Sequence, residues 1–193
     1  CVDAGGALVT PIMDYLAEPP EGVAEGYDKI APAFSEVFAN TSPSALTLAR
    51  QLYWIETEFP DVFARIAQVI PWSAYVGFRL GGTPAMEISN LGVFSHLVEA
   101  KSGVYSSLVE ARGWTRLFPE RRNAWDVIGE FRGRGGEVLR GRGEILCGIH
   151  VSNANGLRYL ASQSGAFTLL STGTFLIGFE SSAVLSGLTP END

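Results

Sequence analysis

Prolines and glycines divide the apolar pattern of this 193-residue chain into short segments. Apolar residues recur at helical spacing in several of these segments, and each segment stops at a Pro or a Gly, because Pro breaks a helix and Gly readily ends one. Helices are therefore predicted over 45–59, with Ser44 as a possible N-cap, and over 61–70, 73–80 and 106–112.

Strands are predicted between and after these helices. Residues 1–15 suggest a strand, a glycine turn and a second strand, and the Pro, Gly and Glu mixture over 19–27 predicts a loop. The run "EILC" at 144–147 is a short apolar strand, and 167–180 is a hairpin that turns through Ser171, Thr172 and Gly173. The fold class is therefore mixed α/β.

Composition excludes several classes of protein. Hydrophobic residues make up 46% of the chain and charged residues 18%, which is typical of a globular domain. A net charge of −7 argues against a nucleic-acid partner, and no run reaches the roughly eighteen apolar residues of a membrane span. Cys1 and Cys147 are too few for a disulfide scaffold, and no secretory signal opens the chain, so we expect a reduced, cytoplasmic setting.

Two polar constellations are candidate binding sites. The run 148–156, "GIHVSNANG", follows a predicted strand, and strand ends in α/β folds deliver polar side chains to ligands. The run 171–174, "STGT", combines a glycine turn with hydroxyls and could cradle a phosphate. Each also has a structural reading, since Ser and Thr beside Gly are ordinary hairpin chemistry and His150 suits a loop or core.

Other ligand signatures are weak or missing. The sequence has no zinc, Walker-type or dinucleotide motif. Four arginines lie in the glycine-rich stretch 131–144 and are more typical of a solvated loop than of a phosphate site: Arg132, Arg134, Arg140 and Arg142.

Five segments, taken in order, resemble the FGGY family of carbohydrate kinases, particularly its rhamnulokinase, fuculokinase and xylulokinase-like members. They are "SPSALTLARQLYWIETEFPDVF", "IPWSAYVGFRLGGTPAMEISNLG", "GWTRLFPERRNAWDVIG", "ILCGIHVSNA" and "LLSTGTFLIGFE". Together they cover most of the chain, and their shared order is more specific than any one motif.

The resemblance implies an actin-like ATPase fold, also called ribonuclease H-like, which this chain would contain incompletely. Residues 1–163 would form the later part of the N-terminal, sugar-binding domain, and 164–193 the opening strands of the C-terminal, ATP-binding domain. The implied activity transfers the γ-phosphoryl group of ATP, with Mg²⁺, to a hydroxyl of a ketose. The sequence leaves the oligomeric state open, and a homodimer is kept as one option.

The resemblance also implies roles for particular residues. His150 and Ser152 match positions that contact the sugar, and Gly173 and Thr174 match a turn near the ATP phosphates. The family has an aspartate after the histidine, which takes the proton of the attacking hydroxyl, but this chain has Val151. A valine cannot accept a proton, so a second interpretation is a non-catalytic sugar-binding or regulatory relative. Alternatively, Val151 packs in the core and the alignment is wrong.

A second departure from the family pattern lies at Phe94, where many relatives have a histidine. His96 follows two residues later and is expected to be a solvent-exposed loop histidine rather than its replacement.

Overall fold

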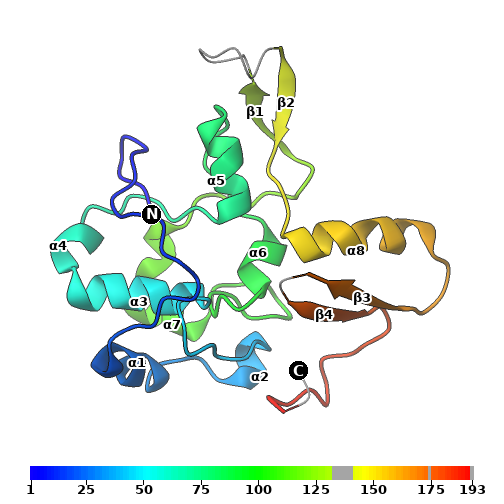
Figure 1. Cartoon of the computed structure of the whole chain (residues 1–193), viewed down its shortest axis with the longest axis horizontal. Helices are drawn as coiled ribbons and strands as arrows, with labels where there is room; N and C mark the ends of the chain where they lie inside the picture. The colour runs from blue at the N-terminus through cyan, green and yellow to red at the C-terminus, as the bar shows by residue number, and fades with distance from the viewer. Residues whose placement is uncertain (132–140, 174, 192–193) are drawn as a thin grey trace.

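Short helices alternate with two pairs of strands in the computed structural model, which describes residues 1–131, 141–173 and 175–191 (Figure 1). The helices are α1 (Glu21–Asp28), α2 (Phe34–Val37), α3 (Leu48–Glu58), α4 (Pro60–Phe63), α5 (Trp72–Arg79), α6 (Ile88–Gly92), α7 (Ser107–Arg112), the 3-10 helix η1 (Trp114–Leu117) and α8 (Val151–Ser162). The strands are β1 (Val127–Phe131), β2 (Gly143–Leu146), β3 (Thr168–Thr172) and β4 (Leu176–Glu180). β1 pairs with β2 and β3 with β4, both antiparallel.

The main core lies among the helices of the first 120 residues. Leu52 and Ile55 of α3 pack there with Tyr27 of α1, Val109 of α7 and Trp114 of η1. Burying an aliphatic or aromatic side chain of this size stabilises the fold by about 1.5–3 kcal/mol. Because none of these helices is long enough to persist alone, this shared core is what holds them in place.

A buried polar cluster joins three segments inside that core. The hydroxyl of Tyr27 and Nδ1 of His96 lie 2.9 Å apart, and the guanidinium of Arg50 lies 4.6 Å from the centre of the Tyr27 ring. Arg50 also pairs with the more exposed Asp28 at 2.6 Å. Burial lowers the pKa of His96, and backbone carbonyls of Ala39 and Asn40 partly oppose that effect. His96 is therefore a core residue, and the expectation of a solvent-exposed loop histidine is wrong.

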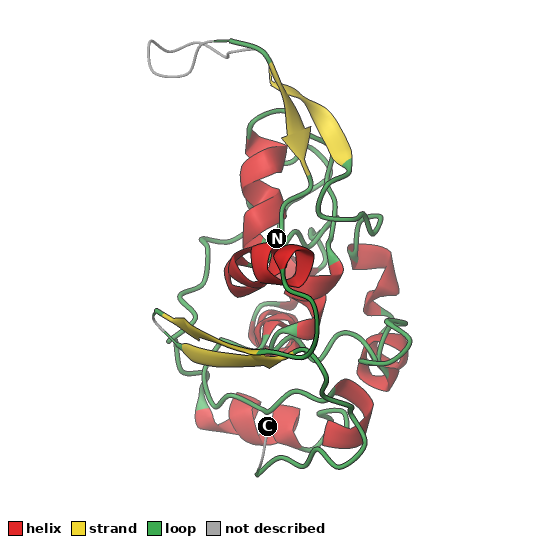
Figure 2. Ribbon diagram, turned by 90° about the vertical axis from the view of Figure 1, so that its right-hand side faces the viewer, coloured by secondary structure: helices red, strands yellow, loops and turns green. Residues whose placement is uncertain are grey.

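A second, smaller core supports β1 and β2, which rise beside α5 (Figure 2). It consists of Ala85, Ile128, Ile145 and Cys147. The backbone of Gly82 approaches Gly129 so closely that a Cβ on Gly129 would lie 2.8 Å from the Cα of Gly82. Glycine is required at this crossing because no side chain fits.

α8 and the β3–β4 hairpin form a layer beside the helical body (Figure 1). Gly156 is the buried residue of α8, and Leu169 of β3 packs over it. The side-chain amide of Asn155 donates to the hydroxyl of Ser171 at 3.2 Å. α8 is thus fixed by few contacts along its length.

The helix predicted over 61–70 is wrong beyond its first turn, since α4 ends at Phe63. The amides of Ala67 and Gln68 instead donate to the carbonyl of Val2, at 2.9 and 3.1 Å. Ile66 is buried nonetheless. Long-range backbone hydrogen bonds therefore override a helical apolar pattern here.

Residues 1–27 also differ from the sequence prediction. The two opening strands reduce to isolated bridges of Val2 with Leu8 and with Gln68. The loop predicted over 19–27 is mostly the helix α1, because Val23 and Tyr27, one turn apart, both reach the core. Elsewhere α3 begins three residues later than predicted, with Thr47 rather than Ser44 at its N-cap.

The remaining element predictions are confirmed. α5 and α7 occupy the helical segments predicted at 73–80 and 106–112, and both are followed by a glycine with positive φ, Gly81 and Gly113. β3 and β4 form the predicted hairpin, but its turn lies after Thr172, since Ser171 and Thr172 pair with Ile177 and Leu176 as part of β3. The mixed helix-and-strand class is therefore confirmed.

We predict that His96 makes stability depend on pH. Because the folded-state pKa of His96 lies below its usual 6.5, the unfolded chain binds more protons just below that pH, and the free energy of unfolding should fall as the pH drops through it. Asn tolerates the left-handed backbone at His96, whose φ is 59°. His96→Asn should flatten this slope in urea denaturation curves recorded between about pH 5 and pH 8.

Phe94→Asn is the matched control, since Phe94 has a similar φ of 47° and does not titrate. It should leave the pH slope as in the unaltered protein. An unchanged slope in His96→Asn would show that His96 does not cause the pH dependence of stability.

Candidate functional site

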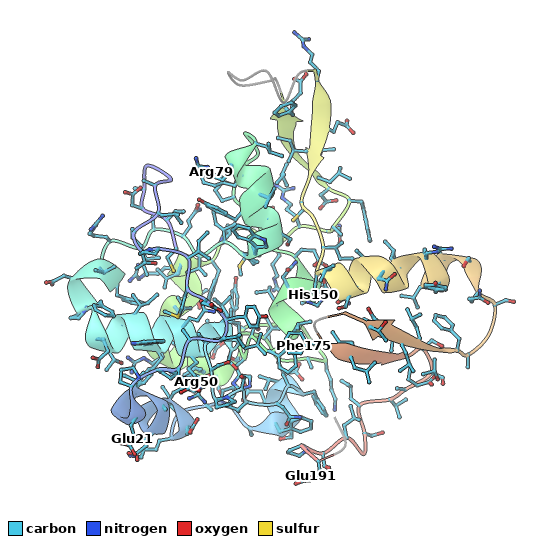
Figure 3. All side chains as sticks on the ribbon, in the orientation of Figure 1. Glu21, Arg50, Arg79, His150, Phe175 and Glu191 are labelled. Carbon is cyan, nitrogen blue, oxygen red and sulfur yellow. The ribbon has the colours of Figure 1, made fainter. Side chains whose placement is uncertain are left out.

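The residues His150, Val151 and Ser152 lie at the start of α8. β2 ends at Leu146, an irregular segment follows, and His150 is the N-cap of the helix, which begins at Val151. The sequence pattern anticipates the strand but not the helix. His150 is half-buried at the junction of α8 with the helical body (Figure 3), and its Nδ1 lies 3.1 Å from Oδ1 of Asn153.

Val151 points into solvent, with 76% of its surface exposed. The alternative that Val151 packs in the core is therefore wrong. The first residue of a helix also lies at the positive end of the helix dipole, so this position favours an acidic side chain over a basic one.

Backbone hydrogen bonds hold the segment that leads from β2 to His150. The amide of Cys147 donates to the carbonyl of Asp126 at 3.0 Å, and that of Gly148 to the carbonyl of Ala124 at 3.2 Å. Gly148 has a φ of 88° and turns the chain from the line of β2 toward α8. This turn places His150 next to α6.

A buried carboxylate lies beneath the start of α8. Glu87 is only 5% exposed, and its Oε2 accepts the amide of Ser89 at 3.0 Å, the hydroxyl of Ser89, and the side-chain amide of Asn90 at 3.2 Å. The hydroxyl oxygen of Ser89 in turn accepts the amide of His150 at 3.0 Å. We call the hydrogen bonds from Glu87 through Ser89 to His150 the tether.

Sequence reasoning missed the tether, because it assigns the segment "EISNLG" to a loop and to no site. The available signal is an N-cap pattern: Glu87 caps α6 through the amide of Ser89. The network continues to α5, where the hydroxyl of Ser73 donates to Oδ1 of Asn90 at 3.1 Å. The network thus joins three segments at His150: α5, α6 with its N-cap, and the start of α8.

The two polar constellations of the sequence are brought close together. Asn155, one turn after Val151, bonds Ser171, two residues before Gly173. Gly173 lies at the tip of the hairpin, where its amide donates to the carbonyl of Phe175 at 3.2 Å. Thr174 lies outside the described residues.

The arginine-rich stretch contributes no described site. Arg132, Arg134 and Arg140 lie outside the described residues, and Arg142 is exposed, as a solvated loop requires.

Cys147 behaves as a buried apolar residue. Burial raises the pKa of its thiol, and the carboxylates of Glu87 and Asp126 raise it further. A thiol with a raised pKa is a poor nucleophile, so Cys147 is a structural residue.

In the described part of the chain no three His, Cys, Asp or Glu side chains converge as metal ligands, so Mg²⁺ is assigned no ligands here. Over the same residues, no helix has the length and apolarity to cross a bilayer.

Comparison with known proteins gives one informative result. No protein-family model matches the sequence, and no curated protein matches it significantly. Among solved structures, the chain is similar to the crystal structure of a carbohydrate kinase from Novosphingobium aromaticivorans, with a TM-score of 0.82 and 28% identity. The match covers 96% of this chain but 41% of that one.

Gly148→Ala should destabilise the protein by about 1–2 kcal/mol, because an L-residue at a φ of 88° is strained. Space is not the obstacle, since an added Cβ would lie 3.5 Å from the carbonyl of Ser73. The measurement is the free energy of unfolding in urea.

Gly143→Ala is the control, because its Cβ would meet none of the described residues within 4 Å and Gly143 lacks a positive φ. It should be neutral or slightly stabilising. Equal losses for the two variants would contradict the role given to the turn at Gly148.

Proposed function

We propose that this chain is part of an FGGY-type carbohydrate kinase that transfers the γ-phosphoryl group of ATP to a hydroxyl of a ketose. The observation that carries the proposal is the similarity to a carbohydrate kinase over 96% of the chain. The five FGGY-like segments in order support the finer assignment. Carbohydrate kinases generally use ATP with Mg²⁺, and both belong to the proposal.

In this proposal, residues at the start of α8 face the sugar. His150 and Ser152 hydrogen-bond its hydroxyls, and residue 151 faces the hydroxyl that attacks the phosphoryl group. The exposure of Val151 supports that role, since a side chain in contact with substrate must be accessible. Phosphoryl transfer depends chiefly on positioning and charge stabilisation, but the hydroxyl must still lose its proton.

We further propose that residues 1–163 belong to the sugar-binding domain and 164–193 to the opening strands of an ATP-binding domain within an actin-like fold. The exposed apolar side chains of the hairpin, Leu170 and Leu176, support this division, because such residues are normally covered by further structure. Gly173 and Thr174 would then lie near the ATP phosphates.

A non-catalytic sugar-binding or regulatory relative is the second candidate. Val151 favours it, because a valine at the base position leaves the sugar contacts in place and removes the proton acceptor. The two candidates predict the same sugar binding but different turnover.

Val151→Asp should raise the turnover of the intact kinase by about 10²-fold or more, the scale of a positioned general base. Sugar affinity should barely change, because a base contributes mainly in the transition state. Stability should change by less than about 0.5 kcal/mol, since residue 151 is exposed at a helix N-terminus. Steady-state kinetics and thermal melts measure these effects.

Val151→Asn is the matched control: it has nearly the same shape as Asp but no basic carboxylate, and should remain slow. A Val151→Asp protein that binds the sugar and gains no turnover supports the non-catalytic relative. Loss of sugar binding in that variant would contradict the placement of residue 151.

Thr174→Val should weaken the use of ATP and leave sugar affinity nearly unchanged, because Thr174 is proposed to contact the nucleotide alone. The comparison is Thr172→Val on the same hairpin. Separate titrations of the intact protein with ATP and with ketose measure both affinities. A loss confined to sugar affinity would show that the hairpin tip serves the other ligand.

A further inference from the structure

We propose that Glu87 and Ser89 are positioning residues that set the start of α8 and, with it, the placement of residues 150 and 151 toward the sugar. Neither residue is expected to touch the reacting atoms. The inference rests on the proposed function for its catalytic consequence, whereas the tether itself rests on the hydrogen bonds described above.

The direction of each hydrogen bond in the tether follows from Glu87. The hydroxyl of Ser89 donates to Oε2 of Glu87, so its hydrogen points at Glu87. The remaining lone pairs of that hydroxyl are then free to accept the amide of His150. Gln at position 87 would weaken this order, because a neutral amide oxygen is a weaker acceptor than a carboxylate oxygen, and an amide NH₂ turned toward Ser89 would compete with the His150 amide.

Burial makes the tether stiff. Glu87 is held by three donors, two of them on Ser89, so neither residue can rotate without leaving a buried polar group unpaired. Asn90, the third donor, is itself held by Ser73 of α5. The position of the His150 amide is thus fixed by contacts with α5 and α6 rather than by solvent.

α8 needs such an anchor because its own packing is slight. Its buried residue is Gly156, and its N-cap His150 makes no side-chain capping bond. Without Ser89 the first turn is expected to fray or shift. A displacement of about 1 Å at a catalytic group can reduce turnover by about 10²-fold, so a small shift of this helix start would matter.

The chain contains a natural control for the tether. At the start of α7, Glu36 accepts the amide of Ser107 at 2.6 Å and its hydroxyl at 2.9 Å. This is the same Glu and Ser chemistry at a helix start, but no bond leads from it to α8. Glu36→Gln therefore separates a general loss of a Ser–Glu contact from loss of the tether.

The first experiment tests the tether without any activity. Amide hydrogen exchange at His150 is measured by NMR in the intact protein and in Glu87→Gln, Ser89→Ala, Ser89→Thr and Glu36→Gln. Exchange should accelerate by about tenfold in Ser89→Ala, as expected for one lost hydrogen bond, and by a smaller factor in Glu87→Gln, which weakens the tether without removing the Ser89 hydroxyl. It should stay unchanged in Glu36→Gln, and Ser89→Thr, which keeps a hydroxyl, should restore protection.

The second experiment measures kcat and KM for ketose with the same substitutions in the Val151→Asp background. Ser89→Ala should lower kcat by at least about tenfold and Glu87→Gln by a smaller factor, and both should leave KM nearly unchanged, since the chemical step needs finer placement than binding does. Glu36→Gln and Ser89→Thr should retain kcat.

The two experiments distinguish the possible failures. Unchanged exchange at His150 in both Glu87→Gln and Ser89→Ala overturns the inference, and so does full kcat in those variants. Accelerated exchange together with no turnover in any Val151→Asp protein supports the tether and counts against the proposed kinase. If Glu87→Gln fails to fold, Ser89→Ala decides, because it removes only one hydroxyl.

Discussion

The structure depends on one constraint: in the described part of the chain no helix exceeds the twelve residues of α8, and helices of this length are marginal on their own in water. Their persistence must come from tertiary contacts. For α3 that contact is the main core around Leu52, reinforced by the buried cluster of Tyr27, Arg50 and His96. α8 has no comparable apolar support, so polar contacts at its start and at Asn155 take a larger share.

Sequence reasoning predicted elements well where local residues determine them. It predicted them poorly where backbone hydrogen bonds from distant segments determine them. Gly113 with a φ of 64° ends α7 as its position predicted, because a left-handed residue at a helix end is a local requirement. By contrast, nothing in the run 61–70 reveals that Val2 will capture the amides of Ala67 and Gln68. His96 was misjudged for the same reason, since its burial comes from Tyr27, distant in sequence.

The candidate site was predictable in part. Small polar residues after an apolar strand singled out the region of His150 as a candidate, although the helix beginning at Val151 was missed. The residues beneath it, Glu87 and Ser89, show at most an N-cap pattern and no ligand-binding motif, and only the fold shows that Ser89 reaches His150. Contacts that position a site come from other segments of the chain, so a reading of one segment shows the groups that face a ligand but not the groups that hold them.

The β3–β4 hairpin has a consequence for how the protein behaves at high concentration. Within the described residues each of its strands pairs only with the other, so each has an outer edge of backbone N–H and C=O groups without a strand partner. Such edges accept additional strands, and Leu170 and Leu176 beside them add apolar surface. These edges are therefore a template for self-association of the protein at high concentration.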